Sequence, residues 1–490
     1  MIQSGNMRIY NTLSRTIEQF EPLQPGEVKL YACGPTVYDY AHLGHMRRYT
    51  MDDVLVRQLQ HEGYQVKFVQ NVTDVGHLVS EGDTGDDKLE KGAKKYQLDV
   101  WSIARKFEDS FMRSMQLMGN QAPTIICRAT EHIPQMLAMV EKLDKAGYTY
   151  VIEDDGVYFD TKKFPDYGLL AGLKIDELKA GARIETIKGK RNSTDFALWK
   201  FERPGENRQM VWESPWHKRS FPGWHIECSA MSQTYLGDQL DIHTGGVDHI
   251  PVHHTNEIAQ SESATGKKPF VKYWVHHNFL LVESEKMSKS KNNFFTIDDL
   301  IEKGFEPMAL RLLFLGAHYR SELNFTWESM AAAQLSWQKL CQLIVKLKED
   351  EKLTLSLSTQ IGHDQGELSL VASDYQSRFF EFMSDDLNTP AALALLWTVT
   401  KDQSLSSEEK LGLLQSFDEV LGLQLMSAEV AIPQALDLNS LPNSIQQLLR
   451  DRQQARQDHQ YQLADQLRQQ LADEGYRVID QGDQQQIYHD

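Results

Sequence analysis

The chain has 490 residues, more than one ordinary domain of about 100–200 residues, and therefore predicts three or four structural units. Its apolar fraction of 41% and charged fraction of 24% are those of a globular protein and exclude collagen-like and disordered classes. The formal charge of −18 excludes an indiscriminate nucleic-acid binder, because phosphate is repelled at long range.

Contact with RNA must therefore be local. The candidate basic stretches are 88–95, 188–191 and the arginines near the C-terminus, Arg450, Arg452, Arg456 and Arg468. Taken singly, each is more typical of a solvated surface than of a binding site.

The four cysteines are scattered, at Cys33, Cys127, Cys228 and Cys341. They do not fit the disulfide framework of a small secreted protein, so reduced thiols or metal ligands are expected. The N-terminus lacks an apolar signal region, and no run of about 18 apolar residues occurs. We expect a cytoplasmic protein without a membrane span.

The early part of the chain has the pattern of a βαβ unit. Strands are predicted over 28–33 and 65–72, on either side of a helix over 44–61. The crossover makes the strands parallel and puts the loop 34–45 at the carboxyl edge of the sheet, where open α/β sheets bind ligands.

The same order returns later, with strands predicted over 239–243 and 272–282 around a helix over 255–265. Between the two halves, residues 131–208 mix a helix with short β segments, which indicates an inserted connective segment. This segment is too short for a large additional enzyme domain.

From about residue 328 onward the periodicity is helical. A bundle is predicted from helices at 331–347, 369–383, 391–401 and 408–421, with linkers at 353–359 and 427–442. A long helix over 443–474 and a hairpin around Gln481–Asp483 then predict a compact terminal module. An isolated solvent-bridging helix with a tail is the alternative.

Two short motifs carry the chemistry. In His-Leu-Gly-His at 42–45, Gly44 lets a nucleotide approach the backbone, and the imidazoles of His42 and His45 can donate to a phosphoryl group at a helix N-terminus. In Lys-Met-Ser-Lys-Ser at 286–290, two lysines bracket a loop that can close over a triphosphate. Each motif alone is more typical of an ordinary polar loop.

The pair, in this order and each at a strand's carboxyl end, resembles the HIGH and KMSKS signatures of class I aminoacyl-tRNA synthetases. The resemblance implies that ATP is a substrate, with Mg²⁺, and that His42, Gly44 and His45 hold its phosphates. It also implies that Lys286 and Lys289 stabilise the transition state of adenylate formation.

Further segments resemble the cysteine-specific family of this class: Tyr31–Asp39, Gly223–Met231 and His253–Gln260. More distant parts also look familial, namely 195–200, 318–325, 385–390 and 452–475, so the resemblance covers about residues 27 to 480.

Carried over position by position, the resemblance implies one zinc ion per chain, held by Cys33, Cys228, His253 and Glu257. Thiolate, imidazole and carboxylate are ordinary zinc ligands. His253 and Glu257 share one helical face at a spacing of four, and this offset together with the resemblance favours His253 over His254. Without the family, cysteines so far apart in sequence are more typical of buried inert thiols.

The resemblance further implies that the zinc binds the thiolate of L-cysteine, which the hydroxyl of serine cannot replace. Loss of such a partner discriminates by about 10⁴-fold or more, so editing is unnecessary. Thr73, Trp224 and Asp248 are implied to line the amino-acid pocket, and Gly245 and Gly246 to lie near the adenylate. A core aromatic for Trp224 and a helix N-cap for Asp248 are the alternatives.

Three segments depart from the family pattern. The usual arginine before the second cysteine is displaced to Arg219, and an acidic run at 81–87 lengthens the segment after Thr73. The C-terminus, 487–490, lacks a basic or tryptophan-bearing ending. These changes concern the pocket, the acceptor-end contacts and anticodon reading.

The expected fold class is α/β, a class I Rossmann-type parallel sheet with a connective insertion, followed by a helical bundle and a small anticodon-binding module. The predicted units are the first half of the catalytic domain (1–130), the connective insertion (131–208), the second half (209–285), the KMSKS loop and stem-contact region (286–330), the bundle (331–426) and the C-terminal module (427–490).

The predicted function is a monomeric cysteine–tRNA ligase, which forms cysteinyl-adenylate, releases pyrophosphate and transfers cysteine to the 3′ end of cysteine tRNA. A ligase that passes the same adenylate to an amino-sugar is the nearest alternative, although the extra surface of 328–490 favours tRNA. A zinc-stabilised scaffold or RNA-binding module without catalysis is the other, and the intact HLGH and KMSKS motifs argue against it.

Overall fold

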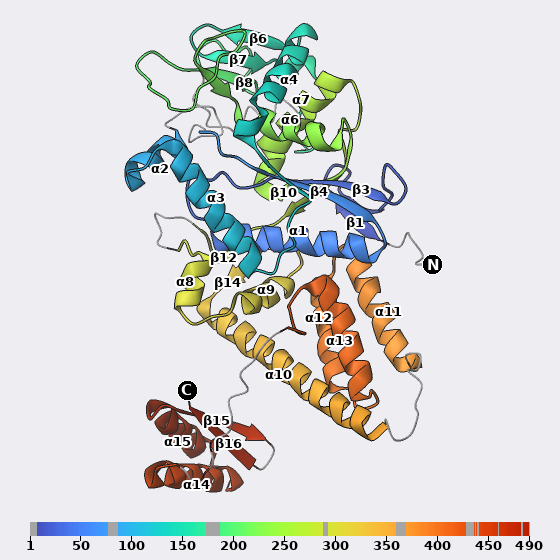
Figure 1. The fold of residues 1–490 in the computed structure, drawn as a ribbon, viewed down its shortest axis with the longest axis vertical. Helices are drawn as coiled ribbons and strands as arrows, with labels where there is room; N and C mark the ends of the chain where they lie inside the picture. The colour runs from blue at the N-terminus through green and yellow to red at the C-terminus, as the bar shows by residue number, and fades with distance from the viewer. Residues whose placement is uncertain are drawn as a thin grey trace. The chain divides into compact units, whose positions relative to one another are not determined.

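The computed structural model describes residues 7–76, 87–172, 187–287, 293–358, 369–427, 436, 438, 441–458, 460–481 and 484–489. These residues form two compact units, Met1–Ser427 and Ala428–Asp490, each of which is described by itself (Figure 1). In this described part of the chain, none of the helices combines the length and apolarity that a membrane span requires.

A five-stranded parallel sheet forms the centre of the first unit, in the order β11-β10-β3-β4-β5. The strands are β3 (Glu27–Ala32), β4 (Gln65–Val72), β5 (Ile125–Arg128), β10 (Leu240–Gly246) and β11 (Val271–His277). Leu30 pairs with Ile242 on one side and with Phe68 on the other. The strand order therefore reverses between β3 and β10, which makes their carboxyl ends the ligand-binding edge of the sheet.

Helices cover both faces of this sheet, which explains why strands such as β10 are almost wholly buried. Helix α1 (Leu43–His61) lies on one face, and α6 (Trp224–Leu236) and α7 (Thr255–Thr265) lie on the other (Figure 1). The predicted βαβ unit and the predicted helix over 255–265 are confirmed.

The prediction of one strand over 272–282 is wrong. The chain leaves the sheet after β11 because Asn278 forms two hydrogen bonds to a distant segment. Its side-chain amide donates to the Arg320 carbonyl oxygen, and its backbone N–H donates to the Tyr319 carbonyl oxygen. It then forms β12 (Leu280–Val282) in a separate sheet with β13 (Glu285–Lys286) and β14 (Leu323–Phe325).

The segment between the two halves contains α4 (Ile133–Lys145) and an antiparallel sheet. Its strands are β6 (Thr149–Ile152), β7 (Gly156–Phe159), β8 (Phe196–Phe201) and β9 (Ser220–Pro222). Helices α2 (Lys88–Tyr96) and α3 (Val100–Leu117) precede it, and β1 (Arg8–Asn11) and β2 (Thr16–Gln19) form an N-terminal hairpin. Within the acidic run, residues 81–86 lie outside the described residues.

The remaining α-helices in the described residues of the first unit are α8 (Ile297–Glu302), α9 (Pro307–Leu315), α10 (Trp327–Ser358), α11 (Leu370–Ser384), α12 (Thr389–Lys401) and α13 (Ser407–Leu421). The predicted bundle is confirmed. The predicted linker at 353–359 is wrong over residues 353–358, which form the last part of α10. This helix contains no proline or glycine that would end it earlier.

The second unit packs α14 (Asn443–Gln457), α15 (Tyr461–Asp473), β15 (Tyr476–Gln481) and β16 (Gln484–His489) around one apolar core. The predicted hairpin is confirmed, but the single helix over 443–474 is wrong. A turn after Gln457 brings Leu471 against Leu449, which one straight helix does not allow. The compact module thus replaces the alternative of an isolated helix.

Arg311 of α9 joins four segments of the first unit from a fully buried position. Its guanidinium donates to Asp53 Oδ2 of α1 at 2.5 Å, to Asn120 Oδ1 at 2.8 Å, and to the carbonyl oxygens of Met118 and Leu421 at 3.0 and 2.7 Å. This contact fixes the bundle against α1.

Replacement Arg311→Met should lower the free energy of unfolding by about 3–5 kcal/mol, because it leaves the Asp53 carboxylate and two carbonyls buried with fewer donors. Urea unfolding followed by circular dichroism measures this loss. Arg113→Met, which removes an exposed arginine from its pair with Asp298, is the control and should cost under about 1 kcal/mol. Equal losses in the two variants would contradict the assignment.

Candidate functional site

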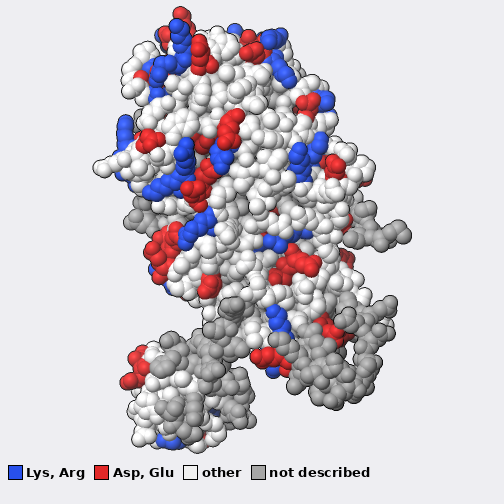
Figure 2. All heavy atoms as spheres, in the orientation of Figure 1, with Lys and Arg blue, Asp and Glu red and all other residues white. Residues whose placement is uncertain are grey.

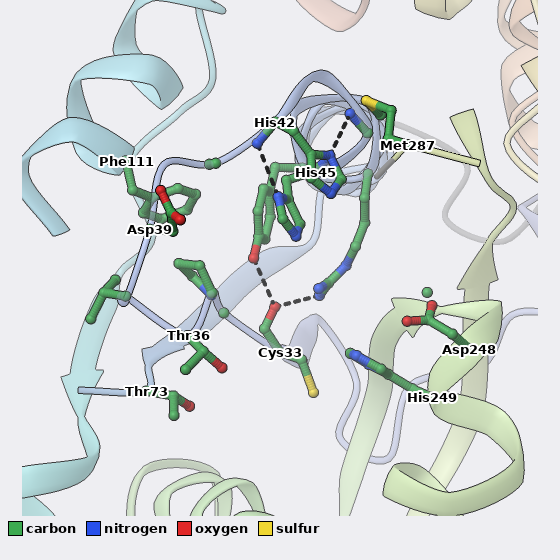
Figure 3. A pocket seen from close by; sticks show the side chains of 18 of the residues that line it. Cys33, Thr36, Asp39, His42, His45, Thr73, Phe111, Asp248, His249 and Met287 are labelled. Atoms are coloured by element: carbon green, nitrogen blue, oxygen red, sulfur yellow. Dashed lines mark hydrogen bonds between the residues drawn. The ribbon is translucent and has the colours of Figure 1, made fainter. Parts of the chain in front are cut away.

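A cavity of about 540 Å³ opens at the carboxyl ends of β3 and β10. The loop after β3 forms one wall, from Cys33 to His45, and α3 contributes Phe107 and Phe111 (Figure 3). The opposite wall comes from the start of α6, the segment after β10 and residues 277–287. The predicted loop thus lies at the predicted edge of the sheet.

The two histidines of the first motif form the N-terminal cap of α1. His42 Nδ1 accepts the backbone N–H groups of Gly44 and His45 at 3.1 and 3.3 Å, and His45 Nδ1 accepts that of His42 at 3.1 Å. Their rings stack with centroids 3.7 Å apart. Because both Nδ1 atoms are acceptors, both Nε2 atoms carry the proton and are donors.

Burial keeps these two imidazoles neutral. It lowers the pKa of His42 to about 4 and the pKa of His45 well below its ordinary value. The N-terminus of α1 therefore offers two neutral N–H donors together with its free backbone N–H groups, an arrangement suited to phosphate.

Gly44 and the second motif meet at the same point. A Cβ added to Gly44 would lie 2.8 Å from Met287 Cε and 2.9 Å from His42 Cε1, so a larger residue would displace these two side chains. Lys286 lines the cavity, and its Nζ lies 3.8 Å from the centroid of the Phe279 ring. Lys289 lies outside the described residues.

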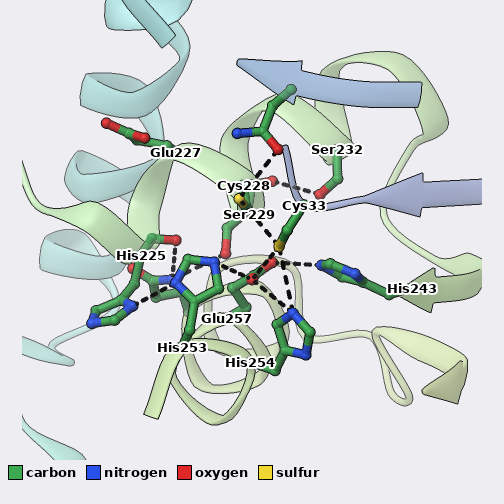
Figure 4. A network of polar contacts seen from close by, with 12 residues as sticks. Cys33, His225, Glu227, Cys228, Ser229, Ser232, His243, His253, His254 and Glu257 are labelled. Atoms are coloured by element: carbon green, nitrogen blue, oxygen red, sulfur yellow. Dashed lines mark hydrogen bonds and ion pairs between the residues drawn. The ribbon is translucent and has the colours of Figure 1, made fainter. Parts of the chain in front are cut away.

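Four side chains that could hold a metal ion meet at the base of the cavity (Figure 4). Cys33 follows β3, Cys228 lies on α6, His253 precedes α7 and Glu257 lies in its first turn. All four are buried, and their donor atoms lie within 4.8 Å of one another. The structure thus brings together the complete set that the sequence predicted.

The spacing of these donors fits a tetrahedral zinc ion. Ligands at zinc bond lengths lie about 3.3–3.8 Å from one another. Here the two sulfur atoms are 3.8 Å apart, Cys33 Sγ and Glu257 Oε1 are 4.0 Å apart, and His253 Nε2 and Glu257 Oε1 are 3.0 Å apart. The other three donor pairs lie within 4.8 Å, so the four side chains can adjust around one ion.

A second donor set shares two members with the first and adds His243 and His254. His254 Nε2 lies 3.4 Å from Cys33 Sγ, while its Nδ1 lies 2.7 Å from His276 Nε2. Of the histidines in the two sets, only His253 lines the cavity, as do both cysteines. The set with His253 is therefore the one that a ligand in the cavity can reach.

The electrostatics of this cluster favour a cation. Burial alone would raise the pKa of Glu257, but His243 and His253 outweigh it and hold the pKa at about 2. Burial would likewise lower the pKa of His253, yet Glu257 and Cys228 raise it to about 10. The cluster thus contains a buried carboxylate paired with a protonated His253, and a bound metal ion would take the place of that proton.

Two further histidines, which the sequence analysis did not single out, orient the ligand side chains. His243 Nε2 lies 3.0 Å from Glu257 Oε2, and His225 Nδ1 lies 2.9 Å from His253 Nδ1. Such contacts fix the orientation of metal ligands. The sequence offered one signal for His243, because it lies inside the strand predicted over 239–243. A histidine buried in a strand requires a polar partner.

The residues predicted for the amino-acid pocket surround the same cavity. Thr73, Trp224 and Asp248 all line it. The Thr73 hydroxyl donates to Glu227 Oε2 at 3.0 Å, and the Trp224 ring lies 4.8 Å from that of His253. Asp248 is exposed.

The two predicted glycines differ in position. Gly246 lines the cavity and Gly245 does not. A Cβ on Gly245 would lie 2.3 Å from the His254 ring, so this glycine allows the histidines to pack behind the site. The displaced Arg219 is exposed and pairs with Glu202, away from the cavity lining.

Two side chains beside the cavity were missed by sequence analysis. Arg48 Nη2 donates to the Cys33 carbonyl oxygen at 2.5 Å and so holds the end of β3 against α1 (Figure 3). His277 lines the cavity, and its Nε2 lies 2.8 Å from Asp52 Oδ1. Neither belongs to a local motif, so only the fold reveals them.

Two family models match the chain. The model of the class I (C) tRNA synthetase catalytic domain matches residues 19–335, and that of the cysteinyl-tRNA ligase anticodon binding domain matches residues 438–487.

Similar curated proteins are called cysteine–tRNA ligases. That of Burkholderia lata, cysteine–tRNA ligase 1, is 44% identical over 98% of this chain and 97% of its own length. That of Treponema denticola is 41% identical over 97% of this chain and 98% of its own length.

Two solved structures share the fold at low identity. A Mycobacterium tuberculosis methionyl-tRNA synthetase bound by methionyl-adenylate has a TM-score of 0.55 at 15% identity, covering 83% of this chain and 92% of its own. An Agrobacterium radiobacter K84 LeuRS in a complex with tRNA has a TM-score of 0.57 at 12% identity. The match covers 84% of this chain and 86% of the LeuRS chain. The fold is that of class I aminoacyl-tRNA synthetases, and the chain belongs to the cysteine–tRNA ligase family.

Proposed function

We propose that the cavity at the ends of β3 and β10 activates L-cysteine with ATP and then transfers cysteine to the 3′ end of cysteine tRNA. The observation that carries the proposal is the meeting of the HLGH cap and the buried Cys33–Cys228–His253–Glu257 cluster at one cavity. One end suits phosphate and the other suits a metal that binds sulfur.

Under this proposal Cys33, Cys228, His253 and Glu257 hold one zinc ion per chain. When bound, zinc supplies a Lewis acid that favours the thiolate of L-cysteine over the hydroxyl of serine. Thr73, Trp224 and Asp248 surround the rest of the amino acid, and the ring of Trp224 beside His253 keeps bulk water from that end of the cavity.

The ATP phosphates bind at the N-terminus of α1 in this proposal. The Nε2 donors of His42 and His45 and the close approach allowed by Gly44 hold the phosphates, with Mg²⁺ as their counter-ion. Gly245 and Gly246 keep the end of β10 free of side chains near the adenylate. Lys286 and Lys289 stabilise the charge that develops as pyrophosphate leaves.

The acceptor is tRNA. The chain carries a match to the cysteinyl-tRNA ligase anticodon binding domain, whereas nothing in the comparisons supports the amino-sugar acceptor. We further propose a cytoplasmic monomer divided into the six predicted units. The free thiols of Cys33 and Cys228, 3.8 Å apart, agree with a reducing compartment.

Replacement Cys228→Ser should remove zinc and weaken cysteine binding together, because a serine hydroxyl is a poor zinc ligand. Loss of a residue that only supports a metal ligand lowers metal affinity by about 10–100-fold. Loss of the ligand Cys228 itself should lower zinc affinity by more than this. Zinc content and the KM for cysteine in ATP–pyrophosphate exchange measure the two effects. The control is Cys341→Ser, which changes a buried thiol of α10. This variant should keep the wild-type zinc content and the wild-type KM for cysteine. A Cys228→Ser protein that loses zinc yet rejects serine as before contradicts the proposal.

Replacement His42→Asn should separate the capping role of His42 from its role toward phosphate. Asparagine caps a helix well but lacks the Nε2 donor, so the thermal midpoint should hold while the kcat of exchange falls about 10²–10³-fold. His42→Ala is the control and should also destabilise the protein, by about 0.5–2 kcal/mol. If the His42→Asn protein exchanges pyrophosphate with the wild-type kcat, the proposed role of His42 toward phosphate is refuted.

A further inference from the structure

Helices α2 and α3 carry a concentration of positive charge in an acidic chain. Residues 88–106 contain six lysines and arginines and two acids, although the whole chain has a formal charge of −18. Figure 2 shows lysine and arginine side chains over these helices. Among the cations of this stretch, Lys91, Lys94, Lys95, Arg105 and Lys106 are exposed.

The other two basic stretches do not offer a comparable surface. The Arg191 guanidinium lies 4.2 Å from the Tyr150 ring centroid and pairs with Asp160. Arg452 is buried and donates to Gln485 Oε1. By contrast, none of Lys94, Lys95, Arg105 and Lys106 lies within 4.0 Å of a carboxylate oxygen, as far as the described residues extend.

Aromatic rings are interleaved with these cations and continue into the cavity. Lys95 Nζ and Lys106 Nζ lie 4.6 and 4.5 Å from the Tyr96 ring centroid. The Tyr96 ring is 5.4 Å from that of Phe107, which is 4.9 Å from that of Tyr40. Tyr40 and Phe107 both line the cavity. The basic surface is thus continuous with the site.

We infer that α2 and the first half of α3 form the docking surface for the single-stranded 3′ end of the tRNA. Cations that follow a backbone, with aromatic rings between them, are the chemistry by which proteins bind single-stranded nucleic acid. The terminal nucleotide must enter the cavity to accept cysteine, and this surface leads there. The inference rests on the proposed function and adds the surface that the acceptor strand follows.

The test is a triple variant, Lys94→Gln, Lys95→Gln and Lys106→Gln, in the full chain. ATP–pyrophosphate exchange should stay within about twofold of wild type, because none of the three lysines lines the cavity. The kcat/KM for charging cysteine tRNA should fall about 10–50-fold, and the slope of log affinity against log salt should decrease in size by about 2. The matched control changes Lys142, Lys145 and Lys267, which are exposed elsewhere, and should charge normally.

A cysteine tRNA that lacks its last four nucleotides identifies the part of the RNA involved. It should bind to the wild type and the triple variant with equal affinity. Normal charging by the triple variant, or a binding defect that persists with the shortened tRNA, overturns the inference. A parallel loss of exchange overturns it too, because the lysines then act on adenylation. Failure of the wild-type chain itself to exchange or charge refutes the proposed function instead.

Discussion

The site depends on the pairing of β3 with β10 in the parallel sheet. Cys33 directly follows the first of these strands and lies far in sequence from Cys228, His253 and Glu257, so this pairing brings the four donors together. The same pairing opens the cavity, because the connections from the two strands run to opposite faces of the sheet.

Buried charge then sets what the cavity holds. A fully buried carboxylate at Glu257 and two thiols at its edge are stable beside a cation and unfavourable beside an apolar group. The stacked histidines of α1 are neutral and suit an anion. Under the proposed function, one end of the cavity suits a metal and sulfur and the other suits phosphate, which is what joining cysteine to ATP requires.

Much of this arrangement could be predicted from sequence, because local patterns determine it. Hydrophobic periodicity gave β3, α1 and β4 within a residue or two, and the family resemblance gave the donor set. Contacts distant in sequence could not be predicted. Asn278 ends β11 through carbonyl oxygens more than 40 residues away, and His243 supports Glu257 from a strand with no motif. The turn after Gln457 depends likewise on burying Leu471.

The central claim is that the substrate sulfur joins the two protein sulfurs on one metal. X-ray absorption at the zinc edge of the purified chain counts sulfur ligands directly. The account predicts two sulfur ligands without substrate, three with L-cysteine and two with L-serine. A sulfur count that does not change when L-cysteine is added, or a zinc ion with only nitrogen and oxygen ligands, would contradict it.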